Sequence, residues 1–442
     1  MSQQGPIIIV STAERPSFAS ALDDAKLFPI VEVAIADASR AIAQLQPAAV
    51  LVAMSEAAEA GLEVLAKQIA ARQPYLPLIA VDPQTLLPEN AIPFSQTQGH
   101  LDRLMARLRA ALRVRTLHAT VMRRVDGDPR LGKTLLDTDP VREATVLLIG
   151  RGAAYPALSV ALGERMGVVG ALSIEAAAKH LNIRDIDGIV LGEGFSARVV
   201  DAFLTVLAED TRFRNLPVVA TLDGLTPAYD LPNLEIIAGE PARVAANALP
   251  LIRQHAFEAH LSRTLRSIDA GGLLDPRTGL LTPTAFNRDF ATAVYQTLSR
   301  GGGLSVARFA FDPVQERARL DGARILSRLM RQMDFGTVQD DGSVIVVFAE
   351  TDLRTGHAIA RLPRSSNEIA ERLFRPRIVD PQFCTGGHDE ENCTDHRFPR
   401  HAGKSRIRRR RQDHRHRAGR GQVLDGVEGR DVQLEAEGPE RL

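Results

Sequence analysis

The feature that most constrains the fold is a repeated alternation of short apolar runs with amphipathic segments. In the first part of the chain, apolar runs at 6–11, 48–54 and 76–81 flank alanine-rich helical patterns. The same order returns further on, with strand-like runs at 144–150 and 216–222. Buried apolar strands that alternate with helices are typical of βα units around a parallel sheet. The sequence therefore predicts two α/β domains of similar size in tandem.

The predicted domain boundaries follow from changes in this pattern. A polar stretch with Pro and Gly separates the two α/β domains, and an amphipathic helix follows the second of them. This helix is either a rigid spacer or a dimerisation element, and its apolar side, made of Phe257, Leu261, Leu265 and Ile268, favours a homodimer. The predicted segments are a first domain at 1–125, a linker at 126–143, a second domain at 144–249, a linker or dimerisation helix at 250–272, a third α+β domain at 273–363 and a basic tail at 364–442.

The composition excludes several classes of protein. With 54 basic and 54 acidic residues, no overall field attracts nucleic acid. The two cysteines both lie in the tail, so no disulfide framework is available to the folded part. No apolar run approaches the ~20 residues that a membrane span needs, and the first residues lack the basic region of a signal peptide. We expect a cytoplasmic protein with no membrane insertion and no nucleic-acid partner.

The tail from residue 364 has no apolar periodicity and is predicted to be disordered or the product of a shifted reading frame. Its Cys384, His388, Cys393 and His396 nominally offer four zinc ligands, but their spacing is not that of a common zinc finger. Its basic run at 406–411 lacks interleaved aromatic residues. We therefore expect no metal site and no cofactor in this segment.

The two α/β domains resemble the receiver domains of two-component response regulators. The resemblance lies in the strand order, in the tandem arrangement and in the run Leu-Pro-Val-Val-Ala-Thr at 216–221. It implies a five-stranded flavodoxin-like fold in each domain. Receivers carry paired acids after the first strand, an aspartate nucleophile after the third, and a Thr and a Lys further on.

Most of these phosphotransfer positions are changed in both copies. The nucleophile position falls on Ala53 in the first domain and on Gly192 in the second. Thr221 matches the family's threonine, but Glu240 stands where the lysine belongs. Neither a methyl group nor a hydrogen can accept a phosphoryl group, so we expect no phosphoacceptor. The sequence thus predicts degenerate receivers that act as scaffolds.

The third domain opens with Asp275-Pro276-Arg277-Thr278-Gly279-Leu280, followed by a phenylalanine at position 286. This opening resembles the start of GGDEF domains, and the whole order resembles that of PleD-type diguanylate cyclases. The resemblance implies a nucleotidyl-cyclase-like α+β fold, incomplete here because the pattern ends near residue 363. It also implies that the family's reaction, condensation of two GTP with Mg²⁺, depends on a hairpin with two glycines and two acids.

The hairpin of this chain has lost that pattern. Aligned on the turn, it reads Asp340, Asp341, Gly342, Ser343, Val344. The metal-binding and catalytic acids are replaced, and the Asp-Gly pair is typical of an ordinary tight turn. The family's other metal ligand has Asp312 as its nearest match, followed here by a proline. We expect no catalytic residue at this hairpin, and Mg²⁺ only if it works as a variant cyclase.

One ligand motif of the family is retained. Arg331 and Asp334 form an Arg-x-x-Asp that lies five residues before the hairpin motif, the spacing at which GGDEF proteins bind cyclic-di-GMP. A guanidinium can donate to guanine O6 and N7, and a carboxylate can accept from guanine N1–H. We expect both residues at a helix C-terminal end, with Arg328 one turn earlier as a cation for the ligand's phosphates. The alternative is a solvated ion pair.

The sequence thus favours a non-catalytic signalling adaptor that binds cyclic-di-GMP and passes its state to a protein partner of unknown identity. The first alternative is a diguanylate cyclase with a variant loop. The second is a ligand-free scaffold or localisation protein.

Overall fold

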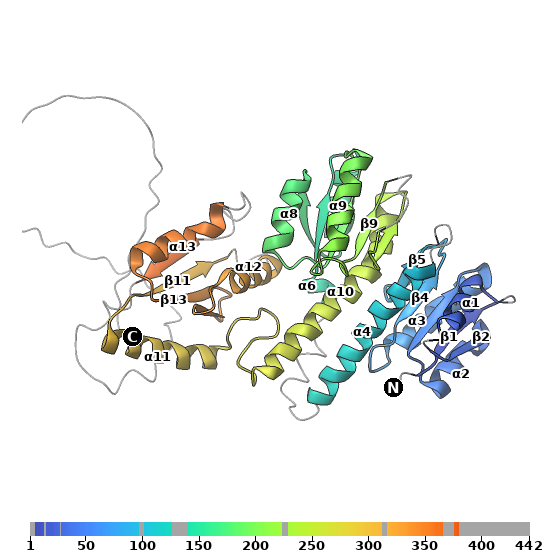
Figure 1. Ribbon diagram of the computed structural model, residues 1–442, viewed down its shortest axis with the longest axis horizontal. Helices are drawn as coiled ribbons and strands as arrows, with labels where there is room; N and C mark the ends of the chain where they lie inside the picture. Colours follow the sequence, from blue (N-terminus) through green and yellow to red (C-terminus); the bar gives the residue numbers. More distant parts are fainter. Residues whose placement is uncertain are drawn as a thin grey trace, which may run out of the picture.

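The computed structural model describes residues 5–12, 15–26, 28–96, 101–125, 139–222, 229–311, 316–365 and 375–379. Figure 1 shows three folded units in a row, with the first and third at opposite ends and the second between them. No helix within these ranges is both long enough and apolar enough to cross a membrane.

The first unit is a parallel α/β sheet in the order β2-β1-β3-β4-β5. Its strands are β1 (Ile7–Ser11), β2 (Ile30–Ala34), β3 (Ala49–Ala53), β4 (Leu78–Val81) and β5 (Ala91–Phe94). Its helices are α1 (Ser17–Asp24), α2 (Ile35–Leu45), α3 (Glu56–Ala70) and α4 (Leu101–Val125). The central strands are apolar throughout because helices cover both faces of the sheet. This strand order is the flavodoxin-like one that the sequence predicts.

The second unit repeats that topology, with all neighbouring strands parallel in the order β10-β9-β8-β6-β7. Its strands are β6 (Thr145–Ile149), β7 (Gly167–Ala171), β8 (Gly188–Leu191), β9 (Val218–Ala220) and β10 (Leu234–Ile236). Its helices are α6 (Pro140–Glu143), α7 (Tyr155–Gly163), α8 (Ile174–Ile183), α9 (Ala197–Glu209) and α10 (Pro241–Asp269). Two mixed α/β domains with five-stranded parallel sheets are therefore confirmed.

The two long helices α4 and α10 lie side by side between the first two units (Figure 1). Leu261 of α10 is fully buried in a cluster with Val114, Val121 and Val125 of α4. Phe257 of α10 makes an edge-to-face contact with His118 of α4, with the ring centroids 5.1 Å apart.

This pairing corrects the reasoning behind the expected dimer. The apolar stripe of α10 is covered by α4 of the same chain, so the stripe no longer calls for a second copy. The helix also begins at Pro241, nine residues before the predicted linker, because proline is well suited to a first helical turn.

The third unit is an antiparallel sheet in the order β12-β13-β11-β14. Its elements are α11 (Pro283–Arg300), β11 (Leu304–Ala310), α12 (Glu316–Leu329), β12 (Phe335–Val338), β13 (Val344–Ala349), α13 (Leu353–Ser365) and β14 (Arg375–Val379). From β11 onward this is a βαββαβ unit of the split type. On β13, Ile345 and Val347 pack towards Phe286 of α11, whereas Val344 and Val346 pack towards α12, so both faces are buried.

The strand β14 lies within the segment that the sequence predicts to be tail. It pairs with β11 along five residue pairs and closes one edge of the sheet. The run Arg-Pro-Arg-Ile-Val has little apolar content, so its pairing depends on β11 rather than on its own pattern. The zinc-spaced residues 384–396 and the basic run at 406–411 lie outside the described residues.

Candidate functional site

The Arg-x-x-Asp motif lies in the turn between α12 and β12. The helix ends at Leu329, two residues before Arg331. The backbone N–H of Asp334 donates to the carbonyl of Arg331 at 3.0 Å, which closes the turn. The expected position at a helix C-terminal end is therefore corrected to the turn after α12, because the chain has already left the helix at this point.

The two side chains of the motif differ in their surroundings. Asp334 is only 8% exposed, and its two carboxylate oxygens accept from the backbone N–H groups of Arg331 and Ala349, both at 3.3 Å. Burial raises the pKa of Asp334, and the two backbone donors together with Arg331 oppose that rise. Arg331 is exposed, and its guanidinium forms no hydrogen bond within the described part of the chain. Asp334 thus holds the turn together and Arg331 faces outward.

Arg328 points towards the second unit. Its guanidinium donates to the carbonyl of Arg184 at 2.6 Å and to the carboxylate of Asp185 at 2.9 Å. The structure therefore does not bring Arg328 to the motif as the expected phosphate-binding cation, because a carboxylate of another unit engages it.

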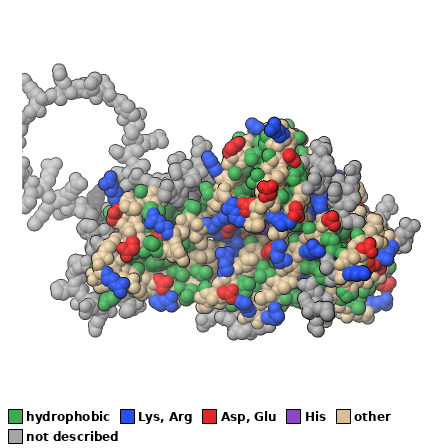
Figure 2. Space-filling model, in the orientation of Figure 1, with side chains coloured by type: hydrophobic (Ala, Val, Ile, Leu, Met, Phe, Trp, Pro, Cys, Tyr) green, Lys and Arg blue, Asp and Glu red, His purple; other side chains and the backbone are tan. Residues whose placement is uncertain are grey.

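Arg328 belongs to a charged face of α12 that docks onto the second unit. The residues at 317, 321, 324 and 328 follow helical spacing, so they share one side of the helix. Arg184, 4% exposed, pairs with Asp321, and Arg317 donates to the carbonyl of Arg142 at 3.0 Å. Figure 2 shows Lys and Arg side chains gathered where α12 meets the second unit. The sequence analysis did not predict this interface, although the helical spacing of the four charged residues could have indicated a charged side of the helix.

The centre of this interface is Glu143 at the end of α6. Its carboxylate accepts from Arg324 and from Arg277, each at 2.7 Å. Glu143 and Arg324 are almost fully buried, whereas Arg277 is partly exposed. Burial raises the pKa of Glu143, but the two arginines outweigh it and hold the pKa below its ordinary value. The carboxylate therefore stays ionised between two cations that both belong to the third unit.

His260 of α10 lies beside this cluster and makes stability depend on pH. It is 3% exposed, and burial, followed by the charge of Arg263, lowers its pKa to about 4. An unfolded histidine has a pKa of about 6.5, so between these values only the unfolded chain binds the proton. We therefore expect stability to fall by about 3 kcal/mol as the pH falls from 6.5 to 4.

Urea unfolding at pH 7 and pH 4, compared between the wild type and His260→Gln, measures this contribution. The variant should lose less stability over this window, since carboxylates that titrate in both proteins cancel in the difference. An equal loss in the two proteins would contradict the assignment to His260.

The hairpin between β12 and β13 is a self-contained turn. The carboxylate of Asp341 accepts from the backbone N–H of Ser343 at 2.9 Å and from its hydroxyl at 2.7 Å, and it also pairs with Arg308. Gly342 has a φ of +79°, which glycine adopts readily. The turn predicted from the Asp-Gly pair is confirmed.

The described residues of the hairpin do not fit a catalytic Mg²⁺ site. Burial raises the pKa of Asp341, but its bonds to Ser343 and the charge of Arg308 lower it overall. The carboxylate is therefore ionised, and its charge is already balanced by Arg308. Gly342 and Ser343 supply no carboxylate. In the described ranges, no group of three or more His, Cys, Asp and Glu side chains could hold a metal ion. Asp312 lies outside the described residues.

The expected phosphoacceptor positions lie at the carboxyl ends of the parallel strands. Ala53 is the last residue of β3, and Gly192 follows β8 directly, with its N–H donating to the carbonyl of Ile149 at 2.7 Å. Thr221 follows β9, and its hydroxyl donates to the carbonyl of Leu191 at 3.3 Å. The two sheets thus present an alanine and a glycine at the positions in question.

No protein-family model matches the chain, and no curated protein matches it. Among solved structures, a sensory box/GGDEF family protein from Caulobacter crescentus is 19% identical over 24% of this chain and 81% of its own, with a TM-score of 0.20. The coiled coil and GGDEF domain of DgcB from the same organism, in complex with c-di-GMP, is 15% identical over 27% and 74%, with a TM-score of 0.21. A 2-hydroxyacid dehydrogenase from Ketogulonicigenium vulgare is 13% identical over 61% and 96%, with a TM-score of 0.16. Similarity at this level carries no argument about family or activity.

Proposed function

We propose that this chain is a non-catalytic signalling adaptor of the cyclic-di-GMP network, in which two receiver-like domains carry a GGDEF-like domain that binds cyclic-di-GMP. Support comes from the motif and its distance to the hairpin, and from two flavodoxin-like sheets followed by a βαββαβ unit. The observation that carries the proposal is the exposed Arg331, whose guanidinium forms no hydrogen bond within the described residues, in the same turn as the carboxylate of Asp334.

The two side chains of the turn offer donors and an acceptor for a guanine edge, although Asp334 is only 8% exposed and must become accessible to the ligand. Arg331 offers a planar fork of donors that matches guanine O6 and N7. Each carboxylate oxygen of Asp334 accepts one backbone hydrogen bond and retains further acceptor capacity, which suits guanine N1–H. Met333, 57% exposed in the same turn, provides a flexible apolar contact for the purine ring. The cations for the phosphates must come from groups other than Arg328 while the domains are docked.

The hairpin favours binding over catalysis. Condensation of two GTP needs metal ions held by aligned acids. Gly342 and Ser343 stand where the family pattern has its acids, and the neighbouring carboxylate of Asp341 is paired with Arg308 and caps its own turn. The receiver-like domains favour a scaffold role in the same way, because Ala53 and Gly192 have no nucleophile for phosphoryl transfer.

Calorimetric titration of the full chain with cyclic-di-GMP tests the proposal. We expect the wild type to bind and Arg331→Ala to weaken binding by about 1–3 kcal/mol, which is the discrimination typical of a bidentate contact to guanine. The matched control is Arg300→Ala, which removes an exposed arginine from the end of α11 and should leave the titration unchanged.

Three results would overturn this assignment. No heat with the wild type would favour a ligand-free scaffold. Formation of cyclic-di-GMP from GTP and Mg²⁺, abolished by Asp341→Ala, would favour the cyclase. Equal weakening by the Arg300 and Arg331 variants would place the ligand elsewhere.

A further inference from the structure

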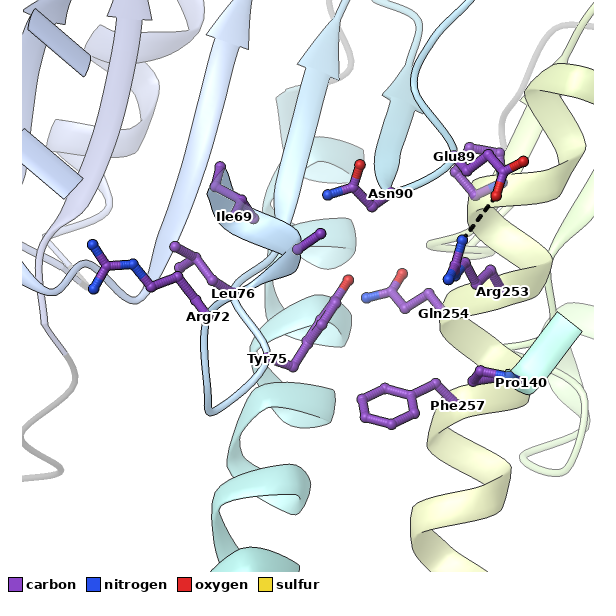
Figure 3. Close-up of a pocket in the computed structure, with 12 residues that line it drawn as sticks. Ile69, Arg72, Tyr75, Leu76, Glu89, Asn90, Pro140, Arg253, Gln254 and Phe257 are labelled. Carbon is purple, nitrogen blue, oxygen red and sulfur yellow. Dashed lines mark hydrogen bonds and ion pairs between the residues drawn. The ribbon is translucent and has the colours of Figure 1, made fainter. Parts of the chain in front are cut away.

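A pocket of about 260 Å³ lies between the first unit and helix α10, remote from the Arg-x-x-Asp turn. Figure 3 shows its lining, which the first unit supplies from the end of α3 and from the segments before β4 and β5. The opposite wall is the middle of α10 together with the first residue of α6. Much of the lining is apolar, with contributions from Ile69, Leu76, Pro250 and Phe257.

One polar group in this pocket has no partner. Gln254 of α10 is 8% exposed, and its side-chain Nε2 is fully shielded from solvent with no hydrogen bond among the described residues. In Figure 3 the amide of Gln254 points across the pocket towards Tyr75. A buried amide donor without an acceptor destabilises the fold. An acceptor in the pocket would relieve this penalty once the amide turns to face it, because Nε2 is shielded in the free protein.

Tyr75 supplies a second donor and a flat wall. Its backbone N–H donates to His118 Nδ1 at 2.9 Å, and its ring meets Phe257 edge-on at 5.8 Å, so the ring is held in place. Burial raises the pKa of Tyr75, which keeps the hydroxyl a neutral donor. Asn90 donates to the carbonyl of Ala66 at 2.8 Å, and this contact leaves its amide oxygen as an acceptor.

The charges at the pocket are balanced. Glu89 pairs with Arg253 at 3.0 Å and with Arg165 at 2.8 Å, and Arg253 also faces Asp139 at 3.6 Å. Arg72 lines the pocket as well, but in Figure 3 its guanidinium extends away from Tyr75 and Gln254. An occupant would meet neutral donors and an acceptor rather than a free cation.

We propose that this pocket binds a small, uncharged, planar heterocycle whose carbonyl oxygen accepts from Gln254 and Tyr75. The rings of Tyr75 and Phe257 suit a flat molecule, and the amide of Asn90 suits a ring N–H. A pocket of this volume is smaller than the sites of drug-sized ligands. Because the walls come from two units, an occupant would stabilise the arrangement of the first unit against α10.

Hypoxanthine and purine form a matched pair of probes, since they differ by the carbonyl oxygen. We expect hypoxanthine to bind the full chain in a calorimetric titration and to raise its Tm, and purine to bind at least tenfold more weakly. Gln254→Met keeps the side-chain length and removes the donor. It should weaken hypoxanthine binding about tenfold or more while leaving the Tm of the free protein unchanged or raised, because an unpaired buried donor is lost.

The matched control is Gln68→Met, on α3 outside the pocket lining, which should leave hypoxanthine binding unchanged. No binding of hypoxanthine to the wild type at millimolar concentration would overturn the proposal. Equal binding of hypoxanthine and purine would also overturn it, as would a Gln254→Met protein that folds, with a Tm within a few degrees of the wild type, and binds hypoxanthine normally. Binding that Arg331→Ala abolishes would assign the ligand to the other site.

Discussion

Replacing Arg107 with alanine is expected to lower the free energy of unfolding by about 3–5 kcal/mol. Arg107 is 0% exposed and pairs at 2.7 Å with Glu235, which is 1% exposed. Its guanidinium also donates to the carbonyls of Pro232 at 2.7 Å and Leu234 at 3.0 Å, and to that of Pro93. The substitution leaves a carboxylate buried without its partner between the first two units, which is the costly case for a buried ion pair.

The control lies on the same helix. Arg113 of α4 also pairs across to α10, with Glu258 at 2.8 Å, but it is 45% exposed. Arg113→Ala should cost less than about 1 kcal/mol, because water replaces the lost interaction. Urea unfolding of the two variants measures the difference. An Arg107→Ala protein within 1 kcal/mol of the control would contradict the role of this pair.

A double variant that replaces both partners shows how much of the lost stability is due to the unpaired charge of Glu235. Arg107→Met with Glu235→Leu should recover part of the loss, since neither member of the pair is then left buried without the other. Recovery should be incomplete because the carbonyls of Pro232 and Pro93 lose the donor that Arg107 supplies, whereas that of Leu234 still accepts from Arg103.

The second large effect is expected at Glu143. Glu143→Ala removes the carboxylate that holds Arg277 and Arg324, and Arg324 is 4% exposed. The buried Arg324 would then lose its anion, whereas the 41% exposed Arg277 keeps Glu316 at 3.6 Å. We therefore expect a loss of about 3–5 kcal/mol from the docked state, caused by the unpaired charge of Arg324. The third unit should separate from the second, which a larger radius of gyration in solution scattering would show.

Glu143→Gln tests the charge at constant shape and should have an effect in the same direction. Asp289→Ala is the control in the third unit, because Asp289 is 41% exposed and pairs only with its neighbour Arg288. An unchanged radius of gyration together with unchanged unfolding for Glu143→Ala would show that the docking does not depend on this carboxylate.

Local patterns predicted much of the fold correctly. The apolar runs that became β1, β3, β4, β6 and β9 are visible because a parallel strand covered on both faces must be apolar along its length. The edge strand β2 was missed, since its exposed outer side allows Glu32 and removes the signal. Helix α4 continues to Val125, because packing against α10 buries its second half.

The candidate site was predictable only in part. The Asp-Gly turn depends on residues within the hairpin itself, so the sequence was sufficient for it. The sequence was not sufficient to predict where the side chains of Arg328 and Asp334 point. Arg328 is held by Asp185, and Asp334 accepts from the N–H of Ala349, so both directions depend on groups outside the motif. A helical spacing describes which residues share a side, but it says nothing about what lies opposite.

By itself, the sequence determined two tandem parallel α/β domains, a tight turn at Asp341 and Gly342, and an alanine and a glycine at the carboxyl ends of two parallel strands. Only the tertiary structure decided that α10 is covered by α4 and that a charged face of α12 docks onto the second unit. It also decided that Arg107 pairs with Glu235, which lies 128 residues further along the chain. The physical reason is one of range. Strands and turns follow from periodicity and backbone preferences within a few residues, whereas the partner of a buried charge or of an apolar stripe is set by which distant surfaces pack together.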